Sequence, residues 1–386
     1  MTAVDVDQAV RDTVSLVRID SQNPGPLEGE CARWVFDRLG QAGVERAIAP
    51  VTDARDNVVA TVRGRGEGPR LVLLAHMDTV AIGDGWSVAP LDGLIRHGRI
   101  YGRGSADMKS GLAVAVNLLE VLAAGPPPRA DVVLCATVDE EAGMAGAYAV
   151  AESGLLRADD QVLALEPTGL RLRLAQVGLR WLELEATGRM AHAGRAHLGV
   201  DANHVVAHIV DRLRERVAAL PYRDELLGRP LFTCGTIAGG VGVNVVPPAC
   251  IARLDLRFVP PMTADDVLAM VQAEAVAAMA VFPGAGVEVR ALGPARPPVR
   301  AADDAHIVRR LRDGFRDVTG HVLESGGADG HEAYTDASMI STLTGSTSCT
   351  VFGPGSSDNA HTADEYVGIS DLETAARVLE RVVADW

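Results

Sequence analysis

Lysine and net positive charge are what this chain lacks most. Lys109 is the single lysine among 36 basic residues, the others being arginine, and the formal net charge is −15. The arginine bias is that of a genome rich in arginine codons. This net negative charge repels the phosphate backbone of nucleic acids, so we expect no nucleic-acid partner.

Long apolar runs and paired cysteines are also missing. No stretch of about 18 apolar residues occurs, and no basic segment followed by an apolar one opens the chain, so we expect neither a membrane span nor a signal peptide. Five scattered cysteines show no C-x-x-C spacing (Cys31, Cys135, Cys234, Cys250, Cys349). They favour reduced, buried thiols in a cytoplasmic protein over a disulfide framework or a zinc finger.

In the first part of the chain, helical and strand-like segments alternate. A length of 386 residues suggests two domains. Apolar spacing predicts helices at 7–19, 27–42 and 108–125, and short apolar strands at 57–62, 71–75, 131–138 and 161–166. Such strands are typical of a central sheet covered by helices on both faces.

Residues 180–292 follow a different pattern. "RWLELEAT" (180–187) alternates apolar and polar residues, as a half-exposed strand does. Helices opened by Asp201 and by the capping pair Thr263 and Asp266 then alternate with strands: helices 201–220 and 263–279, strands 231–239, 251–258 and 287–292. The order β-α-β-β-α-β is that of a ferredoxin-like unit.

We therefore predict an α/β protein with a discontinuous catalytic domain, 1–177 and 291–386. A smaller α+β domain, 178–290, is inserted into it, and "GPARPP" (293–298) is the return linker. A helix at 303–318, a strand at 348–352 and a helix at 371–384 complete the catalytic domain.

Metal-capable side chains stand where the predicted strands end. They are His76 and Asp78, Glu140 and Glu141, Glu166, and His361, and a further carboxylate, Asp107, lies in a Gly-rich segment before a helix. In doubly wound sheets, ligands bind at the carboxyl ends of the strands. Two histidines and three of these five carboxylates would suit two divalent ions of the zinc, cobalt or manganese type.

Each of these features on its own is weak evidence for a metal site. An H-x-D pair is more often part of a turn, and "DEE" is usually a solvated acidic surface. "GRGSADMKSG" (102–111) could be a phosphate loop, but it lacks the G-x-x-x-x-G-K-[ST] spacing and contains Asp107. The combination of these residues at strand ends is what indicates a metal centre.

The chain resembles a di-zinc amidohydrolase and peptidase family. The motifs that carry the resemblance are, in order, "LLAHMDTV", "IRHGRIYGRGSADMKSG", "VDEEAG", "LEPTG" and "FGPGSSDNAHTADEYV". The family contains acetylornithine deacetylase, succinyl-diaminopimelate desuccinylase, aminoacylase-1 and glutamate carboxypeptidase, and the first of these branches looks most similar. The resemblance implies a mixed-sheet catalytic domain with an inserted dimerisation and lid domain.

The resemblance also implies roles at the metal centre. Asp107 would bridge two ions, one held by His76 and Glu166 and the other by Glu141 and His361. Asp78 would orient His76 through an outer hydrogen bond. Glu140 would be the general base that takes a proton from the attacking water and passes it to the leaving amine.

Further residues are implied outside the metal centre. His192 would stabilise the oxyanion in the site of the partner subunit, and Asn244 would assist substrate binding. Arg257 would pair with a substrate carboxylate, to which Gly353 and Gly355 would present backbone N–H groups. Without the resemblance, His192 would be an exposed, inert loop histidine and Arg257 half of a strand-edge salt bridge.

We predict a metal-dependent hydrolase that cleaves the linear amide bond of an N-acyl amino acid, a deacetylase or deacylase. We expect a cytoplasmic homodimer with two divalent ions per chain, zinc first and cobalt or manganese as alternatives. A carboxypeptidase or dipeptidase is the alternative within the class, and a metal-free binding or scaffold relative is the alternative outside it. His331 and Glu332, beside the expected substrate loop, depart from the family pattern and leave the acyl group open.

Overall fold

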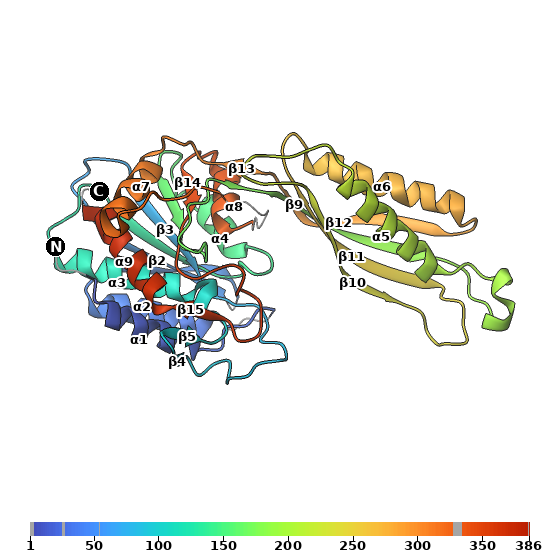
Figure 1. Cartoon of the computed structure of the whole chain (residues 1–386), viewed down its shortest axis with the longest axis horizontal. Helices are drawn as coiled ribbons and strands as arrows, with labels where there is room; N and C mark the ends of the chain where they lie inside the picture. The colour runs from blue at the N-terminus through green and yellow to red at the C-terminus, as the bar shows by residue number, and fades with distance from the viewer. Residues whose placement is uncertain (1–3, 25–27, 54, 327–333, 385) are drawn as a thin grey trace. The chain divides into compact units, whose positions relative to one another are not determined.

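The computed structural model describes residues 4–24, 28–53, 55–326, 334–384 and 386, so His331 and Glu332 lie outside the described residues. The chain forms two compact units (Figure 1). The first contains Met1–Ala175, Arg300–Gly327 and Thr335–Trp386. The second contains Gln176–Val299 and, among the later described residues, Tyr334. None of the helices in the described ranges is long and apolar enough to cross a membrane.

A six-stranded mixed sheet of order β1-β2-β6-β3-β7-β14 forms the centre of the first unit. Its strands are β1 (Glu45–Thr52), β2 (Arg55–Val62), β3 (Leu71–His76), β6 (Val132–Thr137), β7 (Gln161–Ala164) and β14 (Cys349–Val351). The four strands from β6 to β14 are parallel, whereas β1 pairs antiparallel with β2, and β2 with β6. The carboxyl ends of the four parallel strands therefore meet at one edge.

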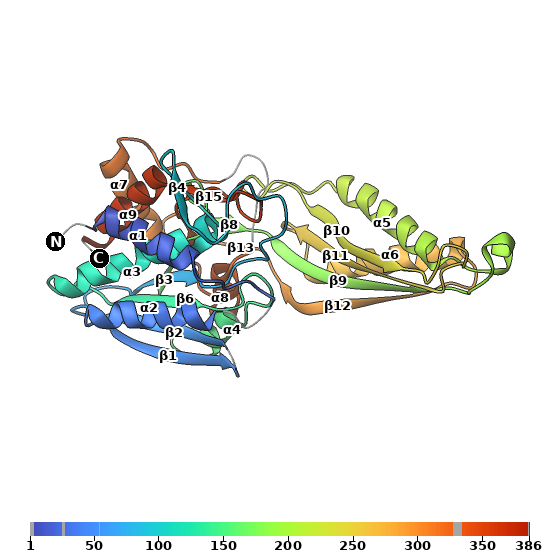
Figure 2. The same ribbon diagram turned by 90° about the horizontal axis from the view of Figure 1, so that it is seen from below.

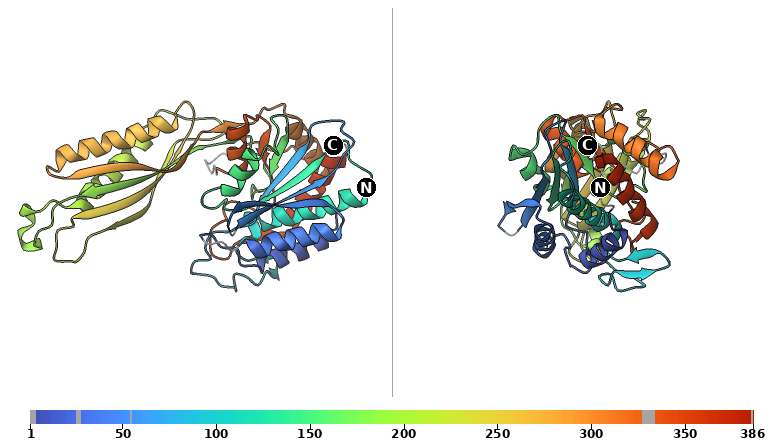
Figure 3. Two further views of the ribbon diagram at one scale, coloured as in Figure 1. Left: turned by 180° about the vertical axis from the view of Figure 1, so that it is seen from behind. Right: turned by 90° about the vertical axis from the view of Figure 1, so that its left-hand side faces the viewer.

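Helices cover both faces of this sheet (Figures 2 and 3), as predicted. On one face, α3 (Ser110–Ala124) packs on β2, β3 and β6. It contacts α1 (Val6–Val17), α2 (Gly29–Gln41) and α9 (Ile369–Ala384), and α9 in turn packs against α7 (His306–Thr319). On the other, α4 (Ala145–Glu152) and α8 (Asp336–Thr344) pack together and against β6 and β7. Because both faces are covered, β3 and β6 are buried along their whole length.

Smaller elements connect these layers. The strands β4 (Leu94–Arg96), β5 (Arg99–Tyr101) and β15 (Tyr366–Gly368) form a three-stranded sheet, and β8 (Ala175–Gln176) pairs with β13 (Val299–Arg300). An irregular turn, Ser105–Lys109, joins β5 to α3.

The second unit is a four-stranded antiparallel sheet with two helices. The strands β9 (Gly178–Thr187), β10 (Leu231–Gly239), β11 (Ala249–Phe258) and β12 (Gly286–Arg296) lie in the order β10-β11-β9-β12. The helices α5 (Ala202–Ala218) and α6 (Ala264–Val281) contribute apolar side chains to a core shared with the sheet. The chain order is the predicted β-α-β-β-α-β, with a short helical turn (Ala193–Leu198) before α5.

Local chemistry explains where these two helices begin. The Asp201 side chain accepts from the N–H groups of Asn203 and His204, and Thr263 forms a capping box with Asp266, so both predicted helix starts are confirmed. The predicted return boundary at 290/291 falls inside β12, which continues to Arg296.

Candidate metal centre and active site

His76 is the last residue of β3, and its ring enters a cluster of acidic side chains. Nε2 lies 3.0 Å from Asp107 Oδ1 and 3.6 Å from Glu166 Oε2. Nδ1 donates to the carbonyl oxygen of Asp78 over 3.0 Å. Because Nδ1 carries that proton, Nε2 is the nitrogen that can face a metal ion.

A second cluster shares Asp107 with the first. His361 Nε2 lies 3.1 Å from Glu141 Oε2 and 3.4 Å from Asp107 Oδ2. One Asp107 oxygen therefore faces each histidine. The ligand atoms within each cluster of three residues, His76–Asp107–Glu166 and Asp107–Glu141–His361, all lie within 4.8 Å of one another. A carboxylate placed in this way can bridge two divalent ions.

Glu365 holds the backbone that carries Asp107. Its carboxylate accepts from the N–H groups of Ala106 over 2.9 Å and Asp107 over 3.1 Å. The same carboxylate is ion-paired with Arg103, and both side chains are buried. This pair fixes the turn Ser105–Lys109 from outside the ligand cluster.

The one lysine of the chain completes this turn. Lys109 is fully buried and donates from Nζ to the carbonyl oxygen of Ile19 over 2.7 Å. Gly104 has a φ of 82°, and a Cβ there would lie 2.6 Å from Thr79 Cγ2 and 3.0 Å from Lys109 Cδ. The Gly-rich segment is therefore a packed support for a carboxylate.

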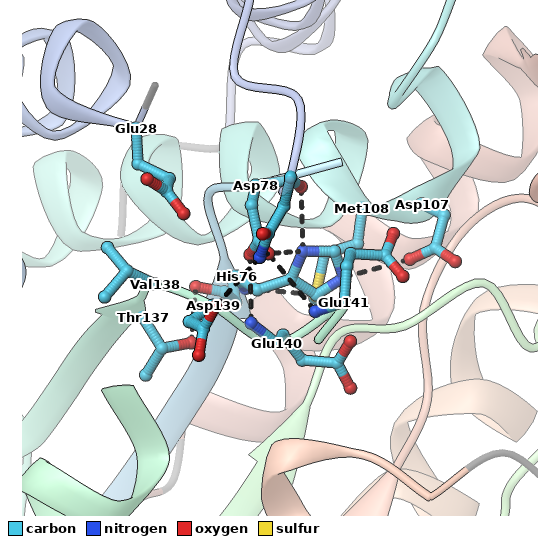
Figure 4. A network of polar contacts seen from close by, with 12 residues as sticks. Glu28, His76, Asp78, Asp107, Met108, Thr137, Val138, Asp139, Glu140 and Glu141 are labelled. Atoms are coloured by element: carbon cyan, nitrogen blue, oxygen red, sulfur yellow. Dashed lines mark hydrogen bonds and ion pairs between the residues drawn. The ribbon is translucent and has the colours of Figure 1, made fainter. Parts of the chain in front are cut away.

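Asp78 contacts the backbone of both glutamates that follow β6 (Figure 4). Its Oδ1 accepts from the Glu140 N–H over 3.1 Å, and its Oδ2 accepts from the Glu141 N–H over 3.2 Å. The Glu141 side chain points toward Asp107, whereas that of Glu140 leaves the turn in another direction. Neighbouring residues can therefore serve different roles.

Charge and burial shift the pKa values of this cluster. Burial lowers the pKa of His76, but Glu166 and Asp107 outweigh it and hold the pKa well above the ordinary histidine value. Contacts with Asp107 and with Glu141 raise the pKa of His361 to about 10. Burial raises the pKa of Glu166 to about 7, against the opposing charge of His76. Protonation of these side chains would therefore compete with binding of a divalent cation.

Glu140 differs from these ligand candidates. Burial raises its pKa well above the ordinary glutamate value, with His76 opposing the shift and Glu166 and Glu141 adding to it. A carboxylate with a raised pKa suits proton transfer near neutral pH.

The donor set fits two divalent cations. The carboxylates of Asp107, Glu141 and Glu166 together carry a charge that two such ions would offset. Glu141 Oε1 is buried and has no hydrogen-bond partner in the described part of the chain. Carboxylates packed this closely are unfavourable without a cation. Imidazole and carboxylate ligands suit zinc, cobalt or manganese.

Three sequence-predicted residues lie in the second unit. His192 and Asn244 stand on adjacent loops, because the Ala193 N–H donates to the Asn244 carbonyl oxygen over 2.9 Å. His192 is exposed, and its Nδ1 accepts from the Gly194 N–H over 3.0 Å. Arg257 is partly exposed, and its Nε lies 3.2 Å from Asp255 Oδ1. The structure therefore contains the salt bridge that was the alternative reading of Arg257.

The two predicted glycines of the first unit are tightly packed. The Gly353 N–H donates to Thr168 Oγ1 over 3.1 Å, and a Cβ at Gly353 would lie 2.4 Å from the Leu165 carbonyl oxygen. Gly355 has a φ of 79°. Any role of these glycines in substrate binding stays a prediction.

Comparison with known proteins agrees with this geometry. The model of peptidase family M20/M25/M40 matches residues 72–385. The chain belongs to this family. A Myxococcus xanthus acetylornithine deacetylase is 30% identical over 353 residues, covering 90% of this chain and 86% of that protein. A probable succinyl-diaminopimelate desuccinylase of Staphylococcus epidermidis is 26% identical over 395 residues, covering 95% of each chain.

Solved peptidase structures share the fold. A Staphylococcus aureus tripeptidase superposes with a TM-score of 0.80 at 23% identity, covering 98% of both chains. A metallo-carboxypeptidase of the M20 family from Sulfolobus solfataricus gives 0.81 at 19% identity, again over 98% of both chains. The predicted family and fold class are thus confirmed, and the chain is a metallohydrolase of the M20 type.

Sequence reasoning missed several polar residues behind this M20 centre. Asn23 and Arg55 contact the turn of Asp139, which precedes the two glutamates. Asp336, near the start of α8, is buried against Thr137 Oγ1 at 2.5 Å, and burial raises its pKa to about 7. The sequence offers one faint signal, the N-cap pattern "TDAS" (335–338) at the start of α8.

Proposed function

We propose that this chain hydrolyses the linear amide bond of an N-acyl amino acid and works with two divalent metal ions. The observation that carries the proposal is the pair of His–carboxylate clusters sharing Asp107, with Glu140 beside them. His76, Asp107 and Glu166 would hold one ion, and Asp107, Glu141 and His361 the other. A metal-free scaffold protein would have no need of all five ligands in this arrangement.

The chain's own residues divide the chemistry among them. When bound, the two ions supply Lewis acidity toward the scissile carbonyl and lower the pKa of water. Glu140 takes the proton of the attacking water and delivers it to the leaving amine, for which its raised pKa is suited. Asp78 keeps His76 in the tautomer that presents Nε2. Arg257, Asn244 and His192 would recognise the substrate carboxylate and the developing oxyanion.

The substrate class follows from the relatives. The sequence relatives at 26–30% identity are named as an acetylornithine deacetylase and a probable succinyl-diaminopimelate desuccinylase, and both names denote removal of an acyl group from an amino acid. The peptidases resemble this chain in fold at 19–23% identity. We therefore favour an N-acyl-amino-acid deacylase. A carboxypeptidase is the second candidate, because Arg257 would bind the carboxylate of either substrate.

We also propose that the enzyme is a homodimer built by the second unit. The edge strand β10, "LFTCGTIAG", has no charged residue and exposes Leu231 and Ile237. The opposite edge, β12, contains Glu288 and Arg290, which are exposed, and exposed charges discourage strand pairing. We further propose a cytoplasmic location for the enzyme, because its five cysteines are free thiols and a reducing compartment keeps thiols free.

A metal analysis and a substrate screen test the proposal. The purified chain, loaded with zinc or cobalt, is assayed with N-acetyl amino acids, N-succinyl amino acids and dipeptides. We expect two ions per chain and faster hydrolysis of N-acyl amino acids than of dipeptides. Faster dipeptide hydrolysis would favour the peptidase alternative, and a chain that binds no metal and cleaves none of these substrates would refute the proposal.

A further inference from the structure

We propose that Asn23 and Arg55 are positioning residues of this active site, which hold the turn that carries Glu140 and Glu141. The inference rests on the proposed function, because it takes Glu140 as the base and Glu141 as a metal ligand. Both residues act through two intermediate carboxylates, Asp78 and Asp139.

The Asn23 amide uses both of its donor hydrogens and its oxygen. Nδ2 lies 2.8 Å from Asp78 Oδ2 and 3.0 Å from Asp139 Oδ1. Oδ1 accepts from an Arg55 guanidinium nitrogen over 3.1 Å. Asn23 is buried, so these contacts have no water to replace them. An amide is the side chain that can donate to two carboxylates while accepting from a guanidinium.

Asp78 links this amide to the catalytic doublet. Its carboxylate is fully buried and accepts three N–H donors: the backbones of Glu140 and Glu141, and Asn23 Nδ2. Each donor stabilises the buried charge. The Asn23 amide therefore sets the rotation of the Asp78 carboxylate, and that carboxylate sets the position of both backbone N–H groups.

Asp139 is the second link. It has a φ of 66°, in the left-handed region that residues other than glycine adopt at some energetic expense. Its carboxylate is ion-paired with Arg55 and accepts from Asn23, and Arg55 also lies 3.4 Å from the buried Glu28 Oε2. These contacts hold the backbone in the conformation that sends Glu140 and Glu141 in different directions (Figure 4).

The position of this turn determines where the base and one metal ligand lie. A shift of the turn moves one ligand of the Asp107–Glu141–His361 cluster and the base together. Displacement of a catalytic group by about 1 Å can lower a rate roughly 10²-fold. Residues that orient metal ligands from outside typically change metal affinity or activity about 10–100-fold when they are altered.

The sharpest test is N23D. This change keeps the size of the side chain but turns a donor to two carboxylates into a third carboxylate. N117D is the matched control, because Asn117 is a buried amide whose Nδ2 donates to Asp12 Oδ2 over 2.9 Å in the helix layer of the same unit. The measurements are zinc stoichiometry and affinity, kcat and KM at saturating zinc, and Tm. N23A, which removes the donors without adding charge, serves if N23D does not fold.

We expect N23D to bind the more weakly held zinc ion roughly 10–100-fold less tightly and to lose kcat by a similar factor. KM should stay within about threefold, because Asn23 is buried and its amide is bonded to Asp78, Asp139 and Arg55. N117D should lower Tm but keep both ions and wild-type kcat. If N23D, or N23A in its place, matches N117D in affinity and kcat, the positioning role is wrong. A wild-type chain without metal or activity would instead overturn the proposed function.

Arg55 gives a second, independent comparison. R55M should reduce kcat and zinc affinity, and R55K, which keeps a charged donor, should recover part of both. R70M is the control, since Arg70 is a similarly buried arginine ion-paired with Asp160 at 2.6 Å. If R70M lowers kcat and zinc affinity as much as R55M, or R55K recovers nothing, the effect is one of general stability and the inference fails.

Discussion

At the scale of single residues, two neighbouring glutamates separate metal binding from proton transfer. The Glu141 carboxylate lies against His361, whereas the Glu140 side chain points in another direction (Figure 4) and its pKa is strongly raised. Asp78 anchors both backbone N–H groups, so the two directions are fixed together. Changes at the two positions should therefore have different signatures.

For the base, E140Q keeps the shape of the side chain but cannot accept a proton. We expect kcat to fall roughly 10²–10⁴-fold while both metal ions stay bound. E141Q is the matched comparison and should lose metal as well as activity. Steady-state kinetics with metal analysis on each variant measures this. A near-normal kcat in E140Q would show that Glu140 is not the base.

For the bridge, D107A removes the carboxylate that faces both His76 and His361. We expect the affinity for both ions to drop sharply, because each loses a ligand at once. D160N, which alters a buried carboxylate paired with Arg70, should leave metal content unchanged. Metal content after dialysis decides the matter, and full occupancy in D107A would exclude the bridging role.

The ligand candidates could be predicted because each follows an apolar strand or lies in a Gly-rich turn. The structure brings all five together. Asn23, Arg55 and Glu365 could not be predicted in this way. They act on carboxylates or backbone N–H groups far away in the chain, and no sequence spacing connects residue 23 with residues 55, 78 and 139.

At the scale of helices and strands, periodicity predicted the buried elements and missed the exposed or short ones. The strand β1 alternates exposed and partly buried residues and contains Pro50, so it lacks the apolar run of a central strand. The helices α4 and α8 have eight and nine residues, too short for a clear helical period. The buried strands β3 and β6 were recognised because both of their faces are apolar.

The helix α7 offers a pH test of packing. Its first residue, His306, stacks edge-on against Trp386, with ring centroids 4.8 Å apart. Burial, helped by Arg310, lowers the pKa of His306 in the folded state. The unfolded chain therefore binds a proton first as pH falls through about 6.5, and stability present above that pH is lost below it.

H306F keeps the aromatic contact but cannot be protonated. We expect its unfolding free energy to fall less than that of the wild type between about pH 8 and pH 5.5. H321F is the control, since His321 is exposed just beyond the same helix. Denaturant unfolding at several pH values measures the difference. Parallel wild-type and H306F curves would show that His306 does not contribute.

At the scale of the whole molecule, one chain contains a metal-binding unit and a separate α+β unit with its own core. His192 and Asn244 belong to the second unit, and the metal-ligand candidates all belong to the first. If His192 and Asn244 act on the substrate, as we propose, one active site needs residues of both units. If β10 pairs two chains, that interaction can come from the partner.

Subunit complementation tests this directly. An H192A chain and an E140Q chain are each expected to be inactive. In a mixed two-fold dimer, the site with an intact Glu140 would receive His192 from the E140Q chain, so activity should return. Random exchange would restore roughly a quarter of the wild-type rate, since half of the dimers are mixed and each has one complete site. Two E140Q-containing chains exchanged together are the control and should stay inactive. If H192A and E140Q remain inactive after proven exchange, His192 does not act across the dimer.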